Sequence, residues 1–267
     1  MMYKRAVMLE AWARDIIFVI AVGALCAPTE IMLGSRRSWL GSRLRGILFW
    51  MPFALSTLAG AALVHSGSQY FKIQPLFEVI FTGENIGQVA RIAIAGTLAL
   101  GSGFLFDFVY YWYHRAQHAF PPLWQFHAVH HSIEDLNATN CSHHWLEGFF
   151  KAFAVTVPLS LLIKLGYPEV VFISAVFSTW GQFVHADSRV GFGPLRWLIV
   201  SPVFHRVHHS TDRRHFDKNF AGQFAIIDVL FGTAVFPGSG ETITTGLSDK
   251  HEPKTLSEQM IRLRPRV

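Results

Sequence analysis

Charged side chains are scarce in this sequence. Asp, Glu, Lys and Arg make up 15% of its 267 residues, whereas 51% are hydrophobic, and the mean hydropathy is +0.30. A soluble domain usually carries about 25% charged residues. The composition therefore excludes an ordinary water-soluble domain and indicates that lipid forms part of the solvent around this chain.

Cysteine is rare as well, since the sequence holds only Cys26 and Cys141. This pair excludes a disulfide framework and a cysteine-rich structural zinc site. The HExxH pattern of zinc proteases is missing, because Glu147 follows His144 at a different offset. A dinucleotide-binding glycine fingerprint and a basic stripe with interleaved aromatic residues are also missing, so nucleic acid is not an expected partner.

Long hydrophobic runs are present instead, at residues 16–28, 47–64 and 92–113. The second and third are long enough to cross a bilayer. The first could pass for a signal peptide, but Ala27-Pro28-Thr29 is a poor cleavage site. We therefore interpret the first run as a retained span or anchor.

Two shorter apolar segments, 152–163 and 170–184, predict a helical hairpin over 150–184 that either crosses the membrane twice or dips into one leaflet. Histidines flank this hairpin, and those that share a metal site must share a membrane face. The link between the first two apolar runs is rich in arginine, which favours the cytosol; it contains Arg36, Arg37, Arg43 and Arg45. Basic residues near the N-terminus also favour the inside, which leaves an alternative orientation open. The sequence predicts an all-α, integral-membrane helical bundle with a cytosolic, histidine-rich di-metal cap.

Histidines carry the chemistry of this sequence, since twelve of the 14 fall between positions 114 and 215. Residues three or four apart share one face of a helix. The first and last histidines of each His-x-x-His-His triplet therefore lie together, and the middle one lies about 100° away. Many buried imidazoles without a metal would leave nitrogens unpartnered. The groups in chain order are His114 and His118, then His127, His130 and His131, then His143 and His144, then His185, then His205, His208 and His209.

The number of histidines indicates two metal ions. Imidazole binds zinc, copper, iron and nickel alike, so the ligand type does not select the metal. Eight or more imidazoles exceed what one ion can use. Two redox-active ions beside a bilayer suit oxygen activation and attack on an unactivated C–H bond.

Longer motifs around these histidines resemble the fatty acid hydroxylase/sterol desaturase superfamily. They begin at Asp107-Phe-Val-Tyr-Tyr-Trp-Tyr-His114 and Trp124-x-Phe-His127-x-x-His130-His131-Ser132. They continue with Ser201-Pro-x-Phe-His205-Arg-x-His208-His209, Asp217-Lys-Asn-Phe-Ala-Gly222 and Asp228-x-x-Phe-Gly-Thr233. The resemblance covers roughly residues 100–236. It divides the chain into N-terminal membrane spans (1–99), a catalytic domain (100–236) and a C-terminal tail (237–267).

The resemblance implies a di-iron centre. Between His143 and His144 it favours His144, within His144-Trp-Leu-Glu147, although Trp145 departs from the family's usual proline. Some members carry a further histidine where this chain has Gly181, so either His144 compensates or one iron keeps an open site. The implied ligands are His114, His118, His127, His130, His131, His144, His185, His205, His208 and His209.

Other side chains are candidates for holding these ligands or lining a substrate tunnel. Asp107 lies two helical turns before His114 and either orients a ligand imidazole or pairs with a basic group such as Arg115. Asn137, Asp187, Asn219 and Asp228 are further candidates for contacts behind the ligands. Several aromatic residues either line an acyl tunnel or face lipid and core, namely Phe104, Phe106, Phe108, Tyr110 and Tyr111.

By resemblance, the function is hydroxylation of a lipid C–H bond with O2 and electrons from an external ferredoxin-like or cytochrome donor. A lipid desaturase of the same superfamily is the alternative. From other classes, a zinc-dependent membrane hydrolase would need a carboxylate such as Glu134 or Glu147 at the metal, and a metal carrier would need ligands along a path through the membrane. The expected location is a bacterial inner membrane or an equivalent membrane, with the active site on the cytosolic face.

Overall fold

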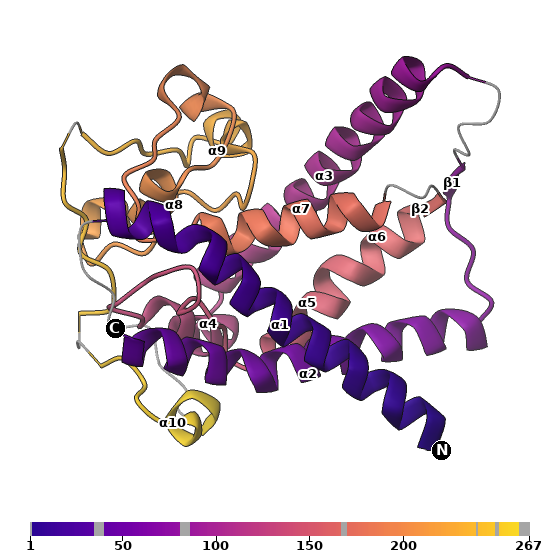
Figure 1. Cartoon of the computed structure of the whole chain (residues 1–267), viewed down its shortest axis with the longest axis horizontal. Helices are drawn as coiled ribbons and strands as arrows, with labels where there is room; N and C mark the ends of the chain where they lie inside the picture. Colours follow the sequence, from indigo (N-terminus) through magenta and orange to yellow (C-terminus); the bar gives the residue numbers. More distant parts are fainter. Residues whose placement is uncertain are drawn as a thin grey trace.

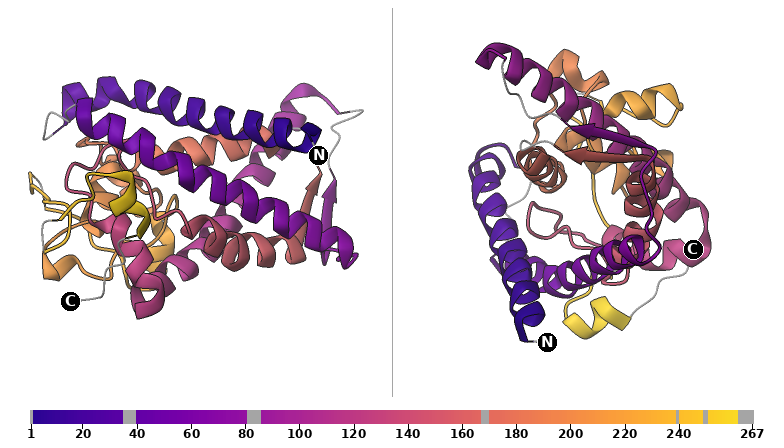
Figure 2. Two further views of the ribbon diagram at one scale, coloured as in Figure 1. Left: turned by 90° about the horizontal axis from the view of Figure 1, so that it is seen from below. Right: turned by 90° about the vertical axis from the view of Figure 1, so that its right-hand side faces the viewer.

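Three long helices dominate the computed structural model, which describes residues 2–34, 40–80, 86–166, 170–238, 240–248 and 251–261. They are α1 (Met2–Leu33), α2 (Leu40–Tyr70) and α3 (Gln88–Ala119). Each contains a segment long and apolar enough to cross a membrane: Val7–Leu33, Leu40–Tyr70 and Gln88–Ala119. The three predicted apolar runs lie inside these helices. Figure 2 shows α1 and α2 packed side by side along one side of the molecule.

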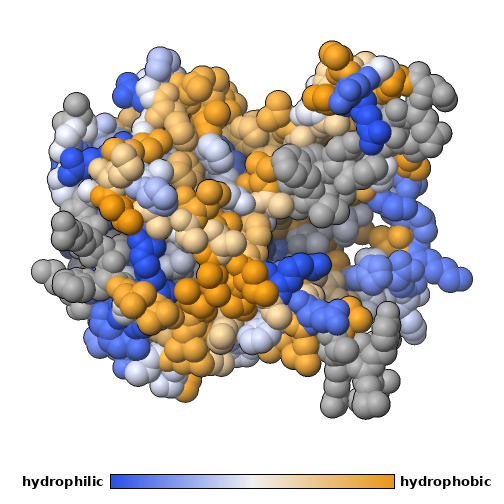
Figure 3. All heavy atoms as spheres, viewed as in Figure 1, coloured by the Kyte–Doolittle hydropathy of each residue, from blue (hydrophilic) through white to orange (hydrophobic). Residues whose placement is uncertain are grey.

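The long helices keep many large apolar side chains on their surface. Ile17, Leu25 and Ile31 on α1, and Val89 and Ile92 on α3, are all exposed. Figure 3 shows hydrophobic side chains gathered along the course of α1. Water does not favour so large an apolar surface, whereas the hydrocarbon of a bilayer does.

Most of the segment in which the sequence predicts a hairpin is helical. The chain runs through α5 (Glu147–Lys151), the π-helical turn η1 (Ala152–Thr156) and α6 (Val157–Leu162), and returns through α7 (Val170–Phe183). Residues 167–169, in the predicted turn, lie outside the described residues.

A small parallel sheet is an exception to the all-helical prediction. Strand β1 (Phe77–Ile80) pairs with β2 (Ile163–Gly166), with Phe77 opposite Ile163. Lys164 donates to Glu78 over 2.5 Å across this pair. Four-residue strands are too short to give a periodic signal, and their pairing joins segments far apart in sequence. Because β1 follows α2 and β2 follows α6, this pair places the end of α6 at the same end of the bundle as the end of α2 (Figure 1).

The cap occupies the other end of the bundle (Figure 1). It comprises α4 (Pro121–His131), α8 (Pro202–His208), α9 (Ala225–Leu230), the 3-10 turns η2 (Gly193–Trp197) and η3 (Arg213–His215), and the loops between them. The short helix α10 (Leu256–Ile261) packs against it, since Gln259 donates to the carbonyl of His143 over 2.5 Å. The predicted division at residues 99 and 100 falls inside the continuous helix α3.

The end of α1 and the first turns of α2, with Arg43 and Arg45, lie at the cap end. Arg43 pairs with Glu30 over 2.6 Å, and Arg45 pairs with Glu252 over 3.4 Å. Glu30 also accepts from the backbone N–H groups of Ala138 (2.9 Å) and Asp187 (3.1 Å), in loops of the cap. The start of α2 and the histidines therefore share one end of the bundle. Arg36 and Arg37 lie outside the described residues.

Candidate metal centre

Four segments bring the histidines together. Helix α3 carries His114 and His118 in its last two turns, and α4 begins directly afterwards at Pro121 and Pro122, residues that suit a helix start. Helix α8 also begins at a proline, behind Ser201, whose Oγ accepts from the backbone N–H of Phe204 over 3.3 Å. The fourth segment follows α7 and carries His185.

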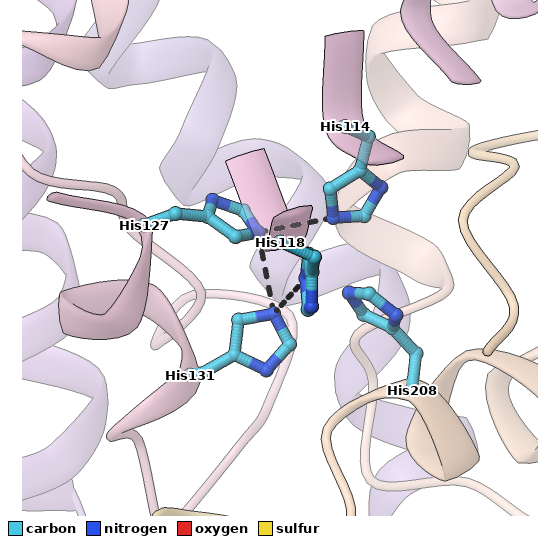
Figure 4. A group of neighbouring side chains, drawn as sticks. All are labelled: His114, His118, His127, His131 and His208. Atoms are coloured by element: carbon cyan, nitrogen blue, oxygen red, sulfur yellow. Dashed lines mark hydrogen bonds between the residues drawn. The ribbon is translucent and has the colours of Figure 1, made fainter. Parts of the chain in front are cut away.

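The first histidine group joins α3, α4 and α8 (Figure 4). The Nε2 atoms of His114 and His127 lie 3.0 Å apart. The Nε2 of His131 lies 3.1 Å from that of His118 and 3.2 Å from that of His127. The ring of His208 closes the group, with its centroid 4.5 Å from that of His114. In this group, one ring nitrogen from each of the five buried side chains lies within 4.8 Å of all the others.

The second histidine group joins α4, the end of α7 and α8. The Nε2 of His185 lies 3.2 Å from that of His130 and 2.9 Å from that of His205. His209, immediately after α8, completes this group of four. The rings of His131 and His209 stack at 4.5 Å, so the two groups are adjacent.

Backbone carbonyls behind the rings fix their orientation. The Nδ1 of His114 lies 2.7 Å from the carbonyl of Phe220, and the Nδ1 of His208 lies 2.7 Å from that of Lys218. In the second group, the Nδ1 of His130 lies 3.2 Å from the carbonyl of Ser142, and the Nδ1 of His185 lies 2.6 Å from that of Gly181. A carbonyl only accepts, so each Nδ1 carries the proton and each Nε2 presents a lone pair to the centre.

The inward-facing nitrogens fit bound cations. His130 and His185 both direct Nε2 lone pairs at one another over 3.2 Å, an arrangement that repels without a positive ion between them. Two nitrogens at right angles on an ion, each ~2.1 Å from it, are ~3.0 Å apart. In the described part of the chain, the Nε2 of His208 and both ring nitrogens of His209 are buried without a hydrogen-bond partner. Two adjacent all-imidazole groups therefore have the composition and spacing of a two-ion site.

Burial also keeps these imidazoles neutral. Removal of water disfavours the charged form, and the neighbouring histidines add to this effect. Burial lowers the pKa of His185 to about 3. It likewise lowers the pKa values of His127, His130, His131, His205, His208 and His209. Neutral imidazole is the form that binds a metal ion, so the cap needs no deprotonation at neutral pH.

Asp107 acts on the centre through a loop. Its carboxylate accepts from the backbone N–H groups of Gly222 (2.8 Å), Gln223 (2.9 Å) and Phe224 (2.7 Å). Neither a ligand ring nor Arg115, the two partners expected from the sequence, is bonded to it in the described part of the chain. The loop it holds carries the Phe220 carbonyl that orients His114.

Asp228 and Asn219 hold the same loop. Asp228 accepts from the backbone N–H groups of Phe220 (2.8 Å) and Ala221 (2.9 Å). The side chain of Asn219 donates to the carbonyl of Val235 over 2.8 Å and accepts from its backbone N–H over 2.7 Å. Asn219 has a positive φ of 57°. Asparagine tolerates this backbone conformation better than most residues. All three side chains thus act on the ligands indirectly.

Asn137 and Asp187 hold loops farther from the rings. The Oδ1 of Asn137 accepts from the backbone N–H groups of Thr139 (3.1 Å) and Asn140 (3.0 Å). Asp187 pairs with the buried Arg206 over 3.0 Å. Arg206 stands next to His205 on α8, so this ion pair ties the segment after α7 to the helix that carries ligands.

His143, rather than His144, lies against the centre. The ring of His143 stacks on that of His130 with centroids 3.9 Å apart. His144 lies outside both groups: its Nε2 is 2.8 Å from the carbonyl of Met260, and its Nδ1 accepts from the N–H of Leu146 over 3.2 Å. The preference for His144 came from the resemblance. Two adjacent residues point in different directions, and only the path of the surrounding loop decides which one faces the histidine groups.

Glu147 lies directly behind the histidines, although the sequence indicated it only as the carboxylate that a zinc hydrolase would need. Its Oε2 lies 3.0 Å from the Nδ1 of His127 and 3.3 Å from the Nδ1 of His143, and Gln117 donates to it over 2.6 Å. The carboxylate lies behind His127, on the opposite side of the ring from the Nε2 that faces the first group. A carboxylate in this place orients the ring and raises the basicity of the nitrogen that faces the ion. Its position four residues after His143, one turn along a helix, was the available signal.

A cavity of about 680 Å³ leads from the histidines into the helical bundle. His114, His130, His185 and His205 line it near the centre, and Phe177, Ile163 and Leu165 line it farther along α7 and β2. Of the five aromatic residues expected at a tunnel or interface, Phe106 and Tyr110 line this cavity. Phe104 and Phe108 are exposed, and Tyr111 is fully buried with its hydroxyl 2.9 Å from Thr233 Oγ1.

Comparison with known proteins agrees with this site. Residues 99–233 match the model of the fatty acid hydroxylase family. The chain is 32% identical over 197 residues to alkylglycerol monooxygenase from Homo sapiens, which covers 73% of this chain and 43% of that protein. It is 33% identical over 147 residues to ornithine lipid hydroxylase OlsE from Rhizobium tropici, which covers 54% of this chain and 44% of that protein. The chain thus spans less than half the length of these relatives, and no solved structure matches it. Because the family match contains both histidine groups and half of the sequence, the chain belongs to the fatty acid hydroxylase family.

Proposed function

We propose that this chain is a membrane-bound lipid hydroxylase with two iron ions, one in each histidine group. A single observation carries the proposal: two adjacent groups of neutral, buried imidazoles lie at the end of an apolar cavity inside a bundle that suits a membrane. The names of the relatives, a monooxygenase of alkylglycerols and a hydroxylase of ornithine lipids, support the reaction class.

The reaction consumes one O2, two electrons and two protons, puts one oxygen atom into a lipid C–H bond and releases the other as water. The bound ions supply the one-electron redox chemistry that this reaction requires. The chain holds the ions on rigid rings, admits an apolar lipid chain along the bundle, and excludes water from the reacting carbon. The electrons come from a separate donor of the ferredoxin or cytochrome class.

The second histidine group is the one that contacts the substrate. Three of its four members line the cavity, whereas the first group contributes His114. Gly181, where some family members carry another histidine, also lines the cavity, and no described atom lies within 4 Å of the place a Cβ would take. This open position beside the second group is where O2 and the lipid carbon meet.

A zinc hydrolase is less well supported. Such an enzyme needs a carboxylate beside the metal-bound water. Glu147 instead contacts His127 at Nδ1, while the Nε2 of the same ring faces the other ligands. The carboxylate is thus placed to orient a ligand. Hydroxylation and desaturation share this site, and the names of the relatives favour hydroxylation.

The residues at the cap end of the bundle indicate how the protein is oriented in the membrane. Arg43 and Arg45 of the arginine-rich segment share that end with the histidines, and such segments face the cytosol. Strands β1, after α2, and β2, after α6, lie together at the other end. We therefore place the centre at the cytosolic face, with the hairpin crossing the bilayer twice.

Metal content tests the proposal directly. Protein purified in detergent after growth with iron should hold about two irons per chain, as two separate imidazole groups require. His208→Ala and His209→Ala should each lose iron from one group, whereas His144→Ala should retain both ions. Incubation with O2, a reductant and membrane lipids should give products heavier by one oxygen. One tightly held zinc without iron would overturn the proposal.

A further inference from the structure

A cationic side chain lines the substrate cavity. Lys151 ends α5, directly before the π-helical turn η1, and is partly buried. Its Nζ lies 5.6 Å from the ring centroid of Phe106 and 5.7 Å from that of Tyr110. Among the described residues, no carboxylate or carbonyl pairs with this ammonium group. An ionisable residue inside a membrane bundle is costly, and its retention points to a functional partner.

Lys151 lies at the end of the cavity nearest to the metal ligands. The ring of Tyr110, which it faces, is 5.4 Å from the ring of His114. The backbone at Gly222 packs on the other side, since a Cβ there would lie 3.6 Å from Tyr110 Cε1. The adjacent Gln223 also lines the cavity, and its Oε1 is buried without a hydrogen-bond partner in the described part of the chain.

This end of the cavity therefore offers an ammonium donor and an amide acceptor to a polar group. The part of the cavity beside β2 offers Ile163 and Leu165 to an apolar chain. Hence a bound lipid would place its polar part close to the metal centre and its tail toward β2. The buried Glu147 carboxylate, four residues earlier on α5, acts on the Lys151 charge without pairing with it directly. A neutral lipid would leave the ammonium group without a direct partner, whereas an acidic group would form a charged hydrogen bond with it.

We propose that Lys151 determines substrate class by binding an acidic group, a carboxylate or a phosphate, that lies close to the carbon oxidised in the proposed reaction. The binding part of this inference stands on the cavity alone, and the position of the oxidised carbon rests on the proposed function. Aromatic faces of Phe106 and Tyr110 keep the ammonium group in place before the lipid arrives.

Asp15 supplies the competing explanation. It lines the same cavity from α1, and among the described residues no basic side chain pairs with it within 4.0 Å. If Asp15 were the working partner of Lys151, neutralising either residue would have the same effect on lipid binding. If Lys151 serves an acidic lipid, removal of the Asp15 charge leaves that binding intact or strengthens it, because the cavity loses one negative charge.

Equilibrium binding to the full-length, metal-containing protein in detergent tests the assignment without any turnover. The probes are radiolabelled hexadecanoic acid against methyl hexadecanoate, and hexadecyl phosphate against hexadecanol. The two pairs separate a carboxylate from a phosphate. The variants are Lys151→Met, which keeps the length of the side chain, Lys151→Arg, which keeps its charge, and Asp15→Asn.

We expect Lys151→Met to weaken binding of at least one acidic probe by about tenfold or more, the loss of a charged hydrogen bond. Its neutral counterpart should bind within about twofold of the original protein, which also shows that the variant is folded. Lys151→Arg should preserve the preference for the acid, and so should Asp15→Asn. Equal losses in Lys151→Met and Asp15→Asn, or an unchanged preference in Lys151→Met, would overturn the assignment. Intact acid selectivity without any hydroxylated product would instead contradict the proposed function.

Discussion

Glu147 and His127 form a buried carboxylate–imidazole pair, with Oε2 3.0 Å from Nδ1, and the Nε2 of the same ring faces the first histidine group. Glu147 also lies 3.3 Å from His143, whose ring stacks on His130 of the second group. One carboxylate on α5 thus contacts His127 of the first group and, through His143, the second group. Because α5 begins at Glu147, these contacts connect the helices after residue 147 directly to the histidine groups.

Glu147→Gln should weaken metal binding. The amide keeps the size of the side chain but removes the negative charge that makes the His127 ring a better ligand. Loss of such a partner typically costs about 10- to 100-fold in metal affinity. Titration of the metal-free protein with iron(II), followed by competition with a chelator, measures the change. Unaltered affinity in a folded variant would show that Glu147 only fills space.

His143→Ala and His144→Ala should differ in kind. The His143 ring stacks at 3.9 Å on His130, so its loss should reduce metal content or turnover. The His144 ring binds the Met260 carbonyl over 2.8 Å, so its loss should loosen α10 and lower the melting temperature by a few degrees. Iron analysis and thermal unfolding of both variants, side by side, measure these effects. The reverse pattern would place His144 at the metal.

The sequence predicts the ligand-bearing segments well, because their spacing is local. Helical periodicity places His114 beside His118 and His127 beside His131 within one helix each. The spacing does not show that His208 joins the first group while His205 and His209 join the second, because the rotation of α8 against α4 decides it. Nor does it show the direction of His143, which depends on a loop held by long-range bonds such as Asn140 to Glu252, 2.9 Å.

The same limit applies to Asp107 and to the β1–β2 pair. The motif around Asp107 marks the residue as important, but its three backbone donors lie more than a hundred positions away, at Gly222, Gln223 and Phe224. Strand β2 meets β1 across 86 positions of the sequence. Contacts of this kind depend on how the elements fold back on one another, which periodicity within one segment does not report.

Asp107→Asn should destabilise the cap. One carboxylate oxygen becomes an NH2 group that faces backbone N–H donors, which costs roughly 2–3 kcal/mol. The loop that carries the Phe220 carbonyl then loosens, so iron should be lost first from the group that contains His114. Thermal unfolding and iron content measure both effects. Asp212→Asn is the control, because Asp212 accepts from Arg214 at the protein surface, and its loss should lower stability less than the loss of the buried Asp107 carboxylate.

The metal-free protein should lose stability in acid. Free histidine titrates at about pH 6.5, whereas burial lowers the pKa of His185 to about 3 and depresses those of the neighbouring cap histidines. Below pH 6.5 the unfolded chain binds more protons than the folded one, so stability is complete above that pH and falls as the pH drops toward 3. The melting temperature of chelator-treated protein should therefore be lower at about pH 5.5 than at about pH 7.5. Equal values would contradict neutral, buried rings.

Gly181 offers a test of which group meets substrate. Gly181→His places an imidazole in the last turn of α7, four residues before His185, in space where no described atom lies within 4 Å of a Cβ. The new ring would occupy the open position beside the second group, so iron should be retained while turnover falls by about tenfold or more.

Gly181→Ala is the matched control. Alanine fits the same space, should stabilise the helix by about 0.5–1 kcal/mol, and leaves the position open, so its turnover should stay close to that of the original protein. Product formation by the two variants under one set of conditions measures the difference. Full activity in Gly181→His would move the reacting carbon away from the second group and toward His114.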